Sequence, residues 1–408
     1  MAYIRKLPSG KYQATVRLAN GKRTTKTHKL KSTVSKWATE QEARVNRGEH
    51  RDPRAGQIKL GEWRERVSAN RNIEPTTRAK VDSIWRTHCA TEWEGWPMAA
   101  VTRMEAQAWA NKLKTTRRAR HKGRNVAGPD KTVPVLGAEM IHTCVNTMSK
   151  LYAIAMDETP PLVMSNPFVG LDLPPIVPRP VEFYEHEEAG LLYAAIEELS
   201  GPKWRAAVEL GMHAGLRPGE IYGLHGSRVD WARNQLHVTQ VMTRYGLREY
   251  AKSRRSHRPV PVPSGTLATM WELMKDRDER GRCTCPKVHA DGTRQLGDGP
   301  CPGLVFPAPM GGPIDDGNFR WRVWNPAVEA AGIRRFPPKV MRHTAASWLV
   351  QDGVPLYDVQ ALLGHESFAT TTRYAHLAPE AHSKVIESWN RRTGEQDFSG
   401  PDARVTHE

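Results

Sequence analysis

The amino-acid sequence predicts a multidomain protein of the α+β class, mainly α-helical with small β-sheets. Its 408 residues are long for one compact core and suggest roughly two to four domains of about 100–200 residues each. Residues 11–18 alternate polar and apolar side chains, as a half-buried strand does, whereas later stretches repeat apolar residues at helical spacing. A proline-rich segment at 172–180 separates two of these helical regions.

The charge balance favours a polyanionic partner. Lysines and arginines number 60 against 44 acidic residues, which gives a formal net charge of +16. This excess fits nucleic acid better than an acidic small molecule, although a generally basic surface would give the same count. The start, MAYIRKLPSG, contains no apolar signal segment, and no apolar run approaches the roughly 18 residues that cross a bilayer. We therefore expect a cytoplasmic protein with no membrane partner.

Residues 1–50 predict a small sheet backed by one helix. One face of the strand at 11–18 is apolar and comprises Tyr12, Ala14, Val16 and Leu18. The hairpin dipeptide Asn20-Gly21 follows, then a second strand at 22–30 and a helix from about 33 to 48. The sheet would present the basic side chains of Arg17, Lys22, Arg23, Lys26 and Lys29. A two- or three-stranded ribbon can enter the major groove of DNA; the alternative is an edge sheet kept soluble by lysines.

Residues 58–172, after a linker at 50–57, predict an all-helical domain. Thr102 and Glu105 have the spacing of a capping box. A helical stripe of apolar residues comprises Ile141, Cys144, Val145, Met148, Tyr152 and Ala155. The basic segment 114–125 contains Arg117, Arg118 and Arg120 and is too polar to be buried. It is either a disordered loop or a loop that contacts phosphates.

A third domain begins at about residue 182, because four prolines in 172–180 form a stiff, extended connection. Its pattern is helical, then short strands, then helical again beyond Asn318. It ends near 395, and 396–408 is expected to be a disordered tail. This domain carries its reactive side chains in a distinctive order: Arg217 in GLRPGE, Lys252 in a hairpin-like setting before RPVP, Lys339 and Arg342 in KVMR, His365 in LGH and Tyr374 in TTTRYAH.

In this order the stretches resemble the tyrosine recombinase (phage integrase) family, over about residues 182–390. The resemblance implies a mixed α/β catalytic domain in which Tyr374 is the nucleophile, assisted by Arg217, Lys252, Lys339, Arg342 and His365. Arginine guanidinium groups suit a phosphodiester under attack, because they bind its non-bridging oxygens in bidentate fashion. The lysine of the hairpin could protonate the departing 5′ oxygen. Such chemistry needs no metal and no ATP.

Lys339 departs from the commoner residue of the family, because a histidine usually occupies this position and is thought to assist proton transfer from the nucleophile. The resemblance implies that lysine is an accepted variant. It could act as a base if its pKa were lowered, and otherwise it acts only electrostatically. Each residue of the set could also have a purely structural role, but the ordered match of all of them favours catalysis.

The other two regions resemble the family more weakly. Residues 1–50 resemble the arm-type DNA-binding domain of many integrases, and 58–172 looks like their helical core-binding (SAM-like) domain. The resemblance implies an integrase of a phage or integrative element that works as a homotetramer on double-stranded DNA, at core and arm attachment sites, with possible excision or bending factors. The alternatives are an inactive DNA-binding regulator of the same fold, a type IB topoisomerase-like enzyme and a chromosome-dimer resolvase, although such resolvases usually lack an arm domain.

A cysteine-rich insertion remains. Five cysteines are too few and too odd in number for a disulfide framework. Cys283, Cys285, His289 and Cys301 are four potential ligands for a structural zinc ion, although Cys-x-Cys is tighter than the usual Cys-x₂₋₄-Cys. The alternative is a group of reduced, free thiols. A zinc site here would be structural and remote from the chemistry.

Overall fold

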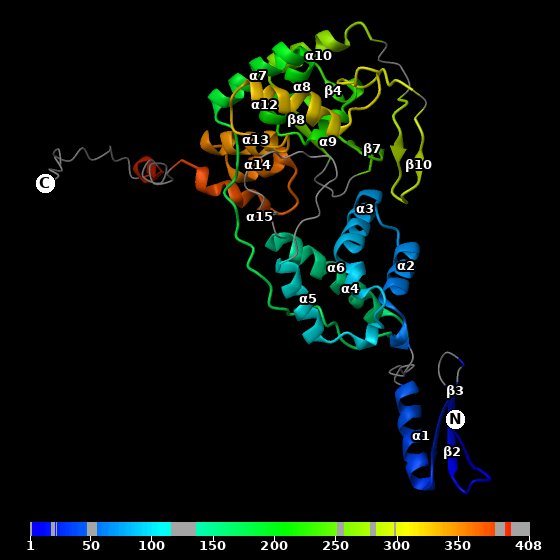
Figure 1. The fold of residues 1–408 in the computed structure, drawn as a ribbon. Helices are drawn as coiled ribbons and strands as arrows, with labels where there is room; N and C mark the ends of the chain where they lie inside the picture. The colour runs from blue at the N-terminus through cyan, green and yellow to red at the C-terminus, as the bar shows by residue number, and fades with distance from the viewer. Residues whose placement is uncertain are drawn as a thin grey trace, which may run out of the picture. The chain divides into compact units, whose positions relative to one another are not determined.

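The structure, a computed structural model, describes residues 2–17, 21, 23–46, 55–115, 136–250, 257–277, 283–297, 299–379 and 388–392. It divides into two compact units, Met1–Pro178 and Arg179–Glu408. The predicted α+β class is confirmed: helices predominate, and three small sheets lie among the described residues (Figure 1). No helix in these ranges is both long and apolar enough to cross a bilayer.

The first unit opens with an antiparallel sheet in the order β1-β2-β3, formed by Tyr3–Lys6, Tyr12–Arg17 and Arg23–His28. The helix α1 (Lys31–Asn46) packs against β2. The alternation of β2 explains this packing, because Ala14 and Val16 are buried together with Val34 and Ala38 of the helix. The predicted apolar face is therefore confirmed for Tyr12, Ala14 and Val16, while Leu18 lies outside the described residues.

The rest of this unit is helical. Its elements are η1 (Ala55–Gln57), α2 (Leu60–Asn70), α3 (Pro75–Ile84), η2 (Trp85–Cys89), α4 (Ala90–Trp93), η3 (Met98–Ala100), α5 (Arg103–Thr115) and α6 (Ala138–Asp157). The predicted capping box begins α5, since the carboxylate of Glu105 accepts a hydrogen bond of 2.7 Å from the backbone N–H of Thr102. All six predicted stripe residues of α6 are buried. They share a core with Trp93, Trp109 and Phe168.

The second unit combines helices with two sheets. Its helical elements are α7 (His186–Ser200), α8 (Pro202–His213), α9 (Pro218–Tyr222), η4 (Gly226–Arg228), α10 (Ser264–Met274), α11 (Asp316–Phe319), η6 (Arg320–Trp324), α12 (Asn325–Ala330), α13 (Val340–Gln351), α14 (Leu356–Leu363), α15 (Phe368–Thr371) and η7 (Thr372–Leu377). One sheet has the order β4-β5-β8, from Val229–Asp230, Gln235–Val238 and Arg258–Pro261. The other has the order β10-β9-β7-β6, from Arg294–Gln295, Lys287–Val288, Gly246–Arg248 and Val241–Thr243.

Helix α13 contributes side chains to both hydrophobic cores of this unit. It packs against α8 on one side and against α14 and η7 on the other. Met341 and Trp348 belong to the larger core that includes α7, α8 and α10. Ala346 and Val350 belong to a smaller core with Leu363 of α14 and Tyr374 of η7. Residues that are far apart in the sequence are thereby held around one helix.

Candidate active site

Arg217 stands at the N-terminus of α9, and Glu220 anchors it there. The backbone N–H and Nη1 of Arg217 donate to the two carboxylate oxygens of Glu220, each over 2.9 Å. Pro218 occupies the first position of the helix, where its missing N–H costs no hydrogen bond. The side chain of Arg217 is 45% exposed, whereas that of Glu220 is 3% exposed. Glu220 therefore fixes one side of the guanidinium, and the exposed part of the guanidinium is open to a ligand.

Glu220 also pairs with a second, deeply buried arginine. Nη2 of Arg258 in β8 lies 3.0 Å from Oε2 of Glu220, and Nε of Arg258 donates to the carbonyl of Leu362 over 2.6 Å. Burial opposes ionisation of Glu220, but the charges of Arg258 and then Arg217 hold the pKa of Glu220 below its usual value. The carboxylate therefore remains charged and fixes both arginines. Sequence reasoning missed Arg258 as a member of the site, although it lies in the RPVP motif.

Arg342 comes from the first turn of α13 and is buried. Its Nη1 donates to the carbonyl of Gly215 over 2.9 Å, and its Nη2 donates to the carbonyl of Leu363 over 2.5 Å. Burial and then the charge of Arg217 lower the pKa of Arg342 to about 9. A guanidinium under such repulsion is stabilised by any anion that enters beside it.

His365 follows the end of α14. Gly364 ends that helix in the left-handed region, at φ +63°, which a side chain would oppose. This turn brings the His365 N–H onto the carbonyl of Gln360 over 3.1 Å. Nδ1 of His365 lies 2.9 Å from Oγ1 of Thr371. Burial, followed by the charges of Arg342 and Arg217, lowers the pKa of His365 to about 4.

Tyr374 lies on η7 with only 1% of its surface exposed. Its hydroxyl is 2.6 Å from Nδ1 of His343, the residue after Arg342 on α13. Burial raises the pKa of Tyr374, while the charges of Arg373 and Arg342 act in the opposite direction. Burial, then the charges of Arg373, Lys339 and Arg342, lower the pKa of His343 to about 4, so its ring is neutral near pH 7.

The structure thus brings together Arg217, Arg342, His365 and Tyr374 from four different elements. Residues 182–381, which contain Arg217, Arg342, His365 and Tyr374, match the model described as the phage integrase family. These residues form a domain of that family of tyrosine recombinases. The predicted enzyme class, a site-specific recombinase, is confirmed.

Other comparisons agree with the family. A tyrosine recombinase XerC-like protein of Caldanaerobacter subterraneus subsp. tengcongensis is 25% identical over an alignment of 339 residues, and the match covers 78% of the recombinase and 78% of that protein. The recombinase superposes on a Tn1549 transposon integrase in complex with transposon right end DNA, with a TM-score of 0.60, 16% identity, and coverage of 83% and 100% of the two chains. A lambda integrase dimer bound to a COC′ core site gives a TM-score of 0.54 at 17% identity, covering 91% and 93%. These two structures share the fold of the recombinase.

The structure describes one of the two lysines that were predicted to be catalytic. Lys252 lies outside the described residues. Lys339 precedes α13 and is exposed; its charge lowers the pKa of His343. The partner of the Tyr374 hydroxyl is His343, a residue that sequence reasoning missed. The motif KVMRHTAAS displayed this histidine, but adjacency to Arg342 does not tell which of the two residues faces η7.

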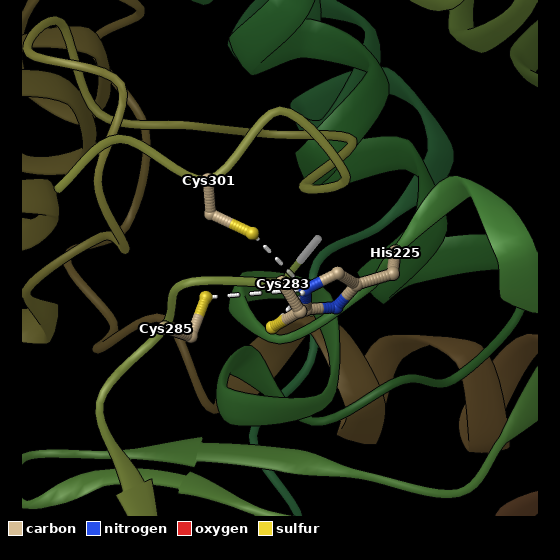
Figure 2. Close-up of side chains that lie close together, drawn as sticks. All are labelled: His225, Cys283, Cys285 and Cys301. Carbon is tan, nitrogen blue, oxygen red and sulfur yellow. Dashed lines mark hydrogen bonds between the residues drawn. The ribbon is translucent and has the colours of Figure 1, made fainter. Parts of the chain in front are cut away.

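The predicted set of metal ligands is wrong in one member. Cys283, Cys285 and Cys301 do converge, but the fourth residue is His225, and ligand atoms of all four lie within 4.8 Å of one another (Figure 2). His289 is exposed at the turn between β9 and β10, where its backbone N–H donates to the carbonyl of Thr293 over 3.0 Å. His289 is therefore not a member of the group that converges.

The basic side chains of the N-terminal sheet fall on two faces. Arg17 pairs with Arg23 across β2 and β3, and Ala14 pairs with Lys26. Directly opposed residues share a face, so Lys26 is on the side of Ala14 that α1 covers, while Arg17 and Arg23 are on the open side. Lys29 is exposed after β3. The remaining predicted DNA-contacting residues, Lys22, Arg117, Arg118 and Arg120, lie outside the described residues.

Proposed function

We propose that this recombinase is the integrase of a phage or another integrative element and that Tyr374 forms a 3′-phosphotyrosyl bond with DNA. The observation that carries the proposal is the convergence of Arg217, Arg342 and His365 on the surroundings of Tyr374. The structural neighbours support it, since they are integrases in complex with transposon DNA or with a core site.

The arginines would hold the phosphodiester. Attack by a hydroxyl places negative charge on the two non-bridging oxygens, and fixed guanidinium groups stabilise that charge without reorganising. Arg217 offers the exposed part of its guanidinium, and Arg342 is already held by two carbonyls. A ring N–H of His365 would donate to the same oxygens. Because the phosphate is an anion, its arrival raises the depressed pKa values of Arg342 and His365 and favours their charged forms.

The proton of Tyr374 would pass to His343. Nδ1 of the neutral imidazole accepts from the tyrosine hydroxyl over 2.6 Å. The approaching phosphate would raise the pKa of His343 in the same way as that of His365, so the base gains strength when the substrate is present. Lys339 tunes this histidine by its charge. Lys252 would protonate the 5′ oxygen as it leaves.

The phosphotyrosyl bond retains the energy of the broken phosphodiester. A 5′ hydroxyl from a second DNA end can therefore attack it, releasing Tyr374 and rejoining the strand without ATP. In the proposed assembly, residues 1–50 bind arm sites, and 58–172 with 182–395 bind the core site. A homotetramer on two duplexes is supported by a lambda integrase tetramer bound to a Holliday junction, which shares the fold. Excision or bending factors could set the direction of the reaction.

The test uses DNA that flanks the gene and carries the candidate attachment site, together with its target. Wild type should yield recombinant junctions and a protein-linked DNA band, whereas Tyr374→Phe should yield neither while still binding DNA. Tyr357→Phe is the matched control, because Tyr357 in α14 is 71% exposed and the substitution is the same. Melting temperatures of both variants show whether the loss of a buried hydroxyl has unfolded the chain.

Three outcomes would contradict the proposal. Junctions formed by Tyr374→Phe would exclude Tyr374 as the nucleophile. DNA binding without cleavage by wild type, with host extract added, would favour an inactive regulator. Relaxation of a supercoiled plasmid that lacks the attachment site would favour a type IB topoisomerase-like enzyme.

A further inference from the structure

We infer that His225, Cys283, Cys285 and Cys301 form a structural zinc site that fastens the cysteine-rich insertion to the catalytic domain. The three sulfur atoms surround one nitrogen: Nε2 of His225 lies 3.2 Å from Sγ of Cys283, 3.4 Å from that of Cys301 and 3.9 Å from that of Cys285 (Figure 2). The insertion lies between α10 and α11, and His225 lies just after α9.

The spacing fits a tetrahedral ion. With Zn–S bonds of about 2.3 Å and a Zn–N bond of about 2.0–2.1 Å, neighbouring ligand atoms of a tetrahedron are separated by roughly 3.5–3.8 Å. The three sulfur-to-nitrogen distances bracket this value, and all four ligand atoms lie within 4.8 Å of one another. Three thiolates with one imidazole are among the sets that structural zinc selects.

Hydrogen bonding alone leaves this convergence unexplained. Nε2 of a neutral histidine has one lone pair, which suits one thiol donor, yet three sulfur atoms approach it. The five cysteines in the described residues are all free, so no disulfide accounts for the grouping either. A cation at the centre would satisfy all four groups together.

The surroundings of His225 prepare it as a ligand. Its Nδ1 lies 2.9 Å from the carbonyl of Gly223, which can accept the proton of Nδ1, and the side-chain amide of Gln240 also contacts Nδ1. With the proton on Nδ1, the lone pair of Nε2 faces the sulfur atoms, as in metal-bound histidines whose second nitrogen is held by a carbonyl. Gly303 allows the insertion to approach the ring, because a Cβ there would be 2.9 Å from Cδ2 of His225.

Two backbone hydrogen bonds near the four ligands also join the insertion to the rest of the domain. The Gly226 N–H donates to the carbonyl of Gly303, and the Leu247 N–H of β7 donates to the carbonyl of Pro286. The zinc would therefore join the insertion to the loop that follows α9, and the hydrogen bond from Leu247 holds β7 to the insertion beside it. Since Arg217 begins α9, the site stabilises the end of the domain that presents this arginine.

The test is the zinc content of the full chain, purified in reductant without a metal-binding tag and measured by mass spectrometry of the elements. We expect about one zinc per chain in wild type, in His289→Ala and in Cys144→Ala, which changes a buried cysteine of the other unit. Cys285→Ser and His225→Ala should lose most of the zinc. His225→Cys should keep it, because four thiolates also form a structural site.

Two further measurements keep the inference testable if a variant fails to fold. Cobalt substituted into wild type should give sulfur-to-metal charge-transfer absorption, which changes in His225→Cys, and a strong chelator should lower the melting temperature of wild type. Wild type without zinc, wild type with iron instead, or a disulfide between two of the three cysteines in protein isolated without reductant would overturn the inference. Loss of zinc in His289→Ala but not in His225→Ala would overturn the ligand set.

Discussion

Tyr374 and His343 form the most informative pair of residues in the molecule. A buried phenol has a raised pKa, which makes it a poor nucleophile, and a buried imidazole has a lowered one, which makes it a weak base. Both shifts are caused first by burial. An anion bound among the arginines would raise the pKa of His343 toward its ordinary value. We therefore expect the pair to be unreactive without the DNA phosphate and more reactive when the phosphate is bound.

His343→Gln should slow DNA cleavage by roughly 10²–10⁴-fold, the range for loss of a general base. Single-turnover cleavage of a nicked attachment site measures this, and the pH dependence of the rate should lose its acidic limb. His237→Gln, an exposed histidine of β5, should cleave at the wild-type rate. A His343→Gln rate that is lower but keeps the wild-type pH profile would mean that His343 only positions Tyr374.

Glu220 stabilises the fold as well as the site, because its carboxylate compensates the charge of buried Arg258. Glu220→Gln should lower the free energy of unfolding by roughly 3–5 kcal/mol, the usual cost of leaving one member of a buried ion pair uncompensated. Glu329→Gln, which removes a carboxylate from an exposed pair with Arg335, should leave the melting temperature unchanged. Equal melting temperatures for the two variants would contradict this assignment.

At the scale of elements, the register of the N-terminal sheet separates its basic residues by face. Arg23→Ala should weaken binding to arm DNA and reduce the slope of log affinity against log salt by about 1, because an open-face arginine can contact a phosphate. Lys26→Ala, on the side that α1 covers, should have a smaller effect on both. Anisotropy titrations of the full chain over a range of salt measure this, and equal losses would argue against the open face as the DNA-binding surface.

Elements with strong local signals were predictable. The alternation at 11–18 and the capping box at Thr102 are confirmed because neighbouring residues decide them. The family resemblance was recognisable because each motif keeps its own short spacing. His225 was not predictable as a partner of the thiols, since 58 residues separate it from Cys283 and only tertiary packing joins them. Arg258 and His343 were missed for the same reason: their roles depend on which face meets Glu220 or Tyr374.

At the scale of the whole molecule, the buried histidines predict acid sensitivity. His343 and His365 have folded-state pKa values of about 4 against an ordinary value of 6.5, so below pH 6.5 the unfolded chain binds protons that the folded chain does not. Stability should therefore fall as the pH decreases from about 6.5 to about 4, by up to about 1.4 kcal/mol per pH unit for each group. Denaturant midpoints across this range measure it, and His343→Gln should show a shallower fall. A midpoint that is constant in wild type would contradict the prediction.

The burial of Tyr374 limits the cleavage of DNA at unintended sequences. A side chain that is 1% exposed meets a phosphodiester only in a released form that uncovers the hydroxyl beside His343, so the closed form is latent. The observed rate of strand breakage is then the intrinsic rate multiplied by the fraction of molecules in the released form. Only DNA that binds the released form in preference can increase that fraction. The recombinase would dissociate from other DNA sequences without cleaving them. It would cleave a chromosome only after binding its own attachment site.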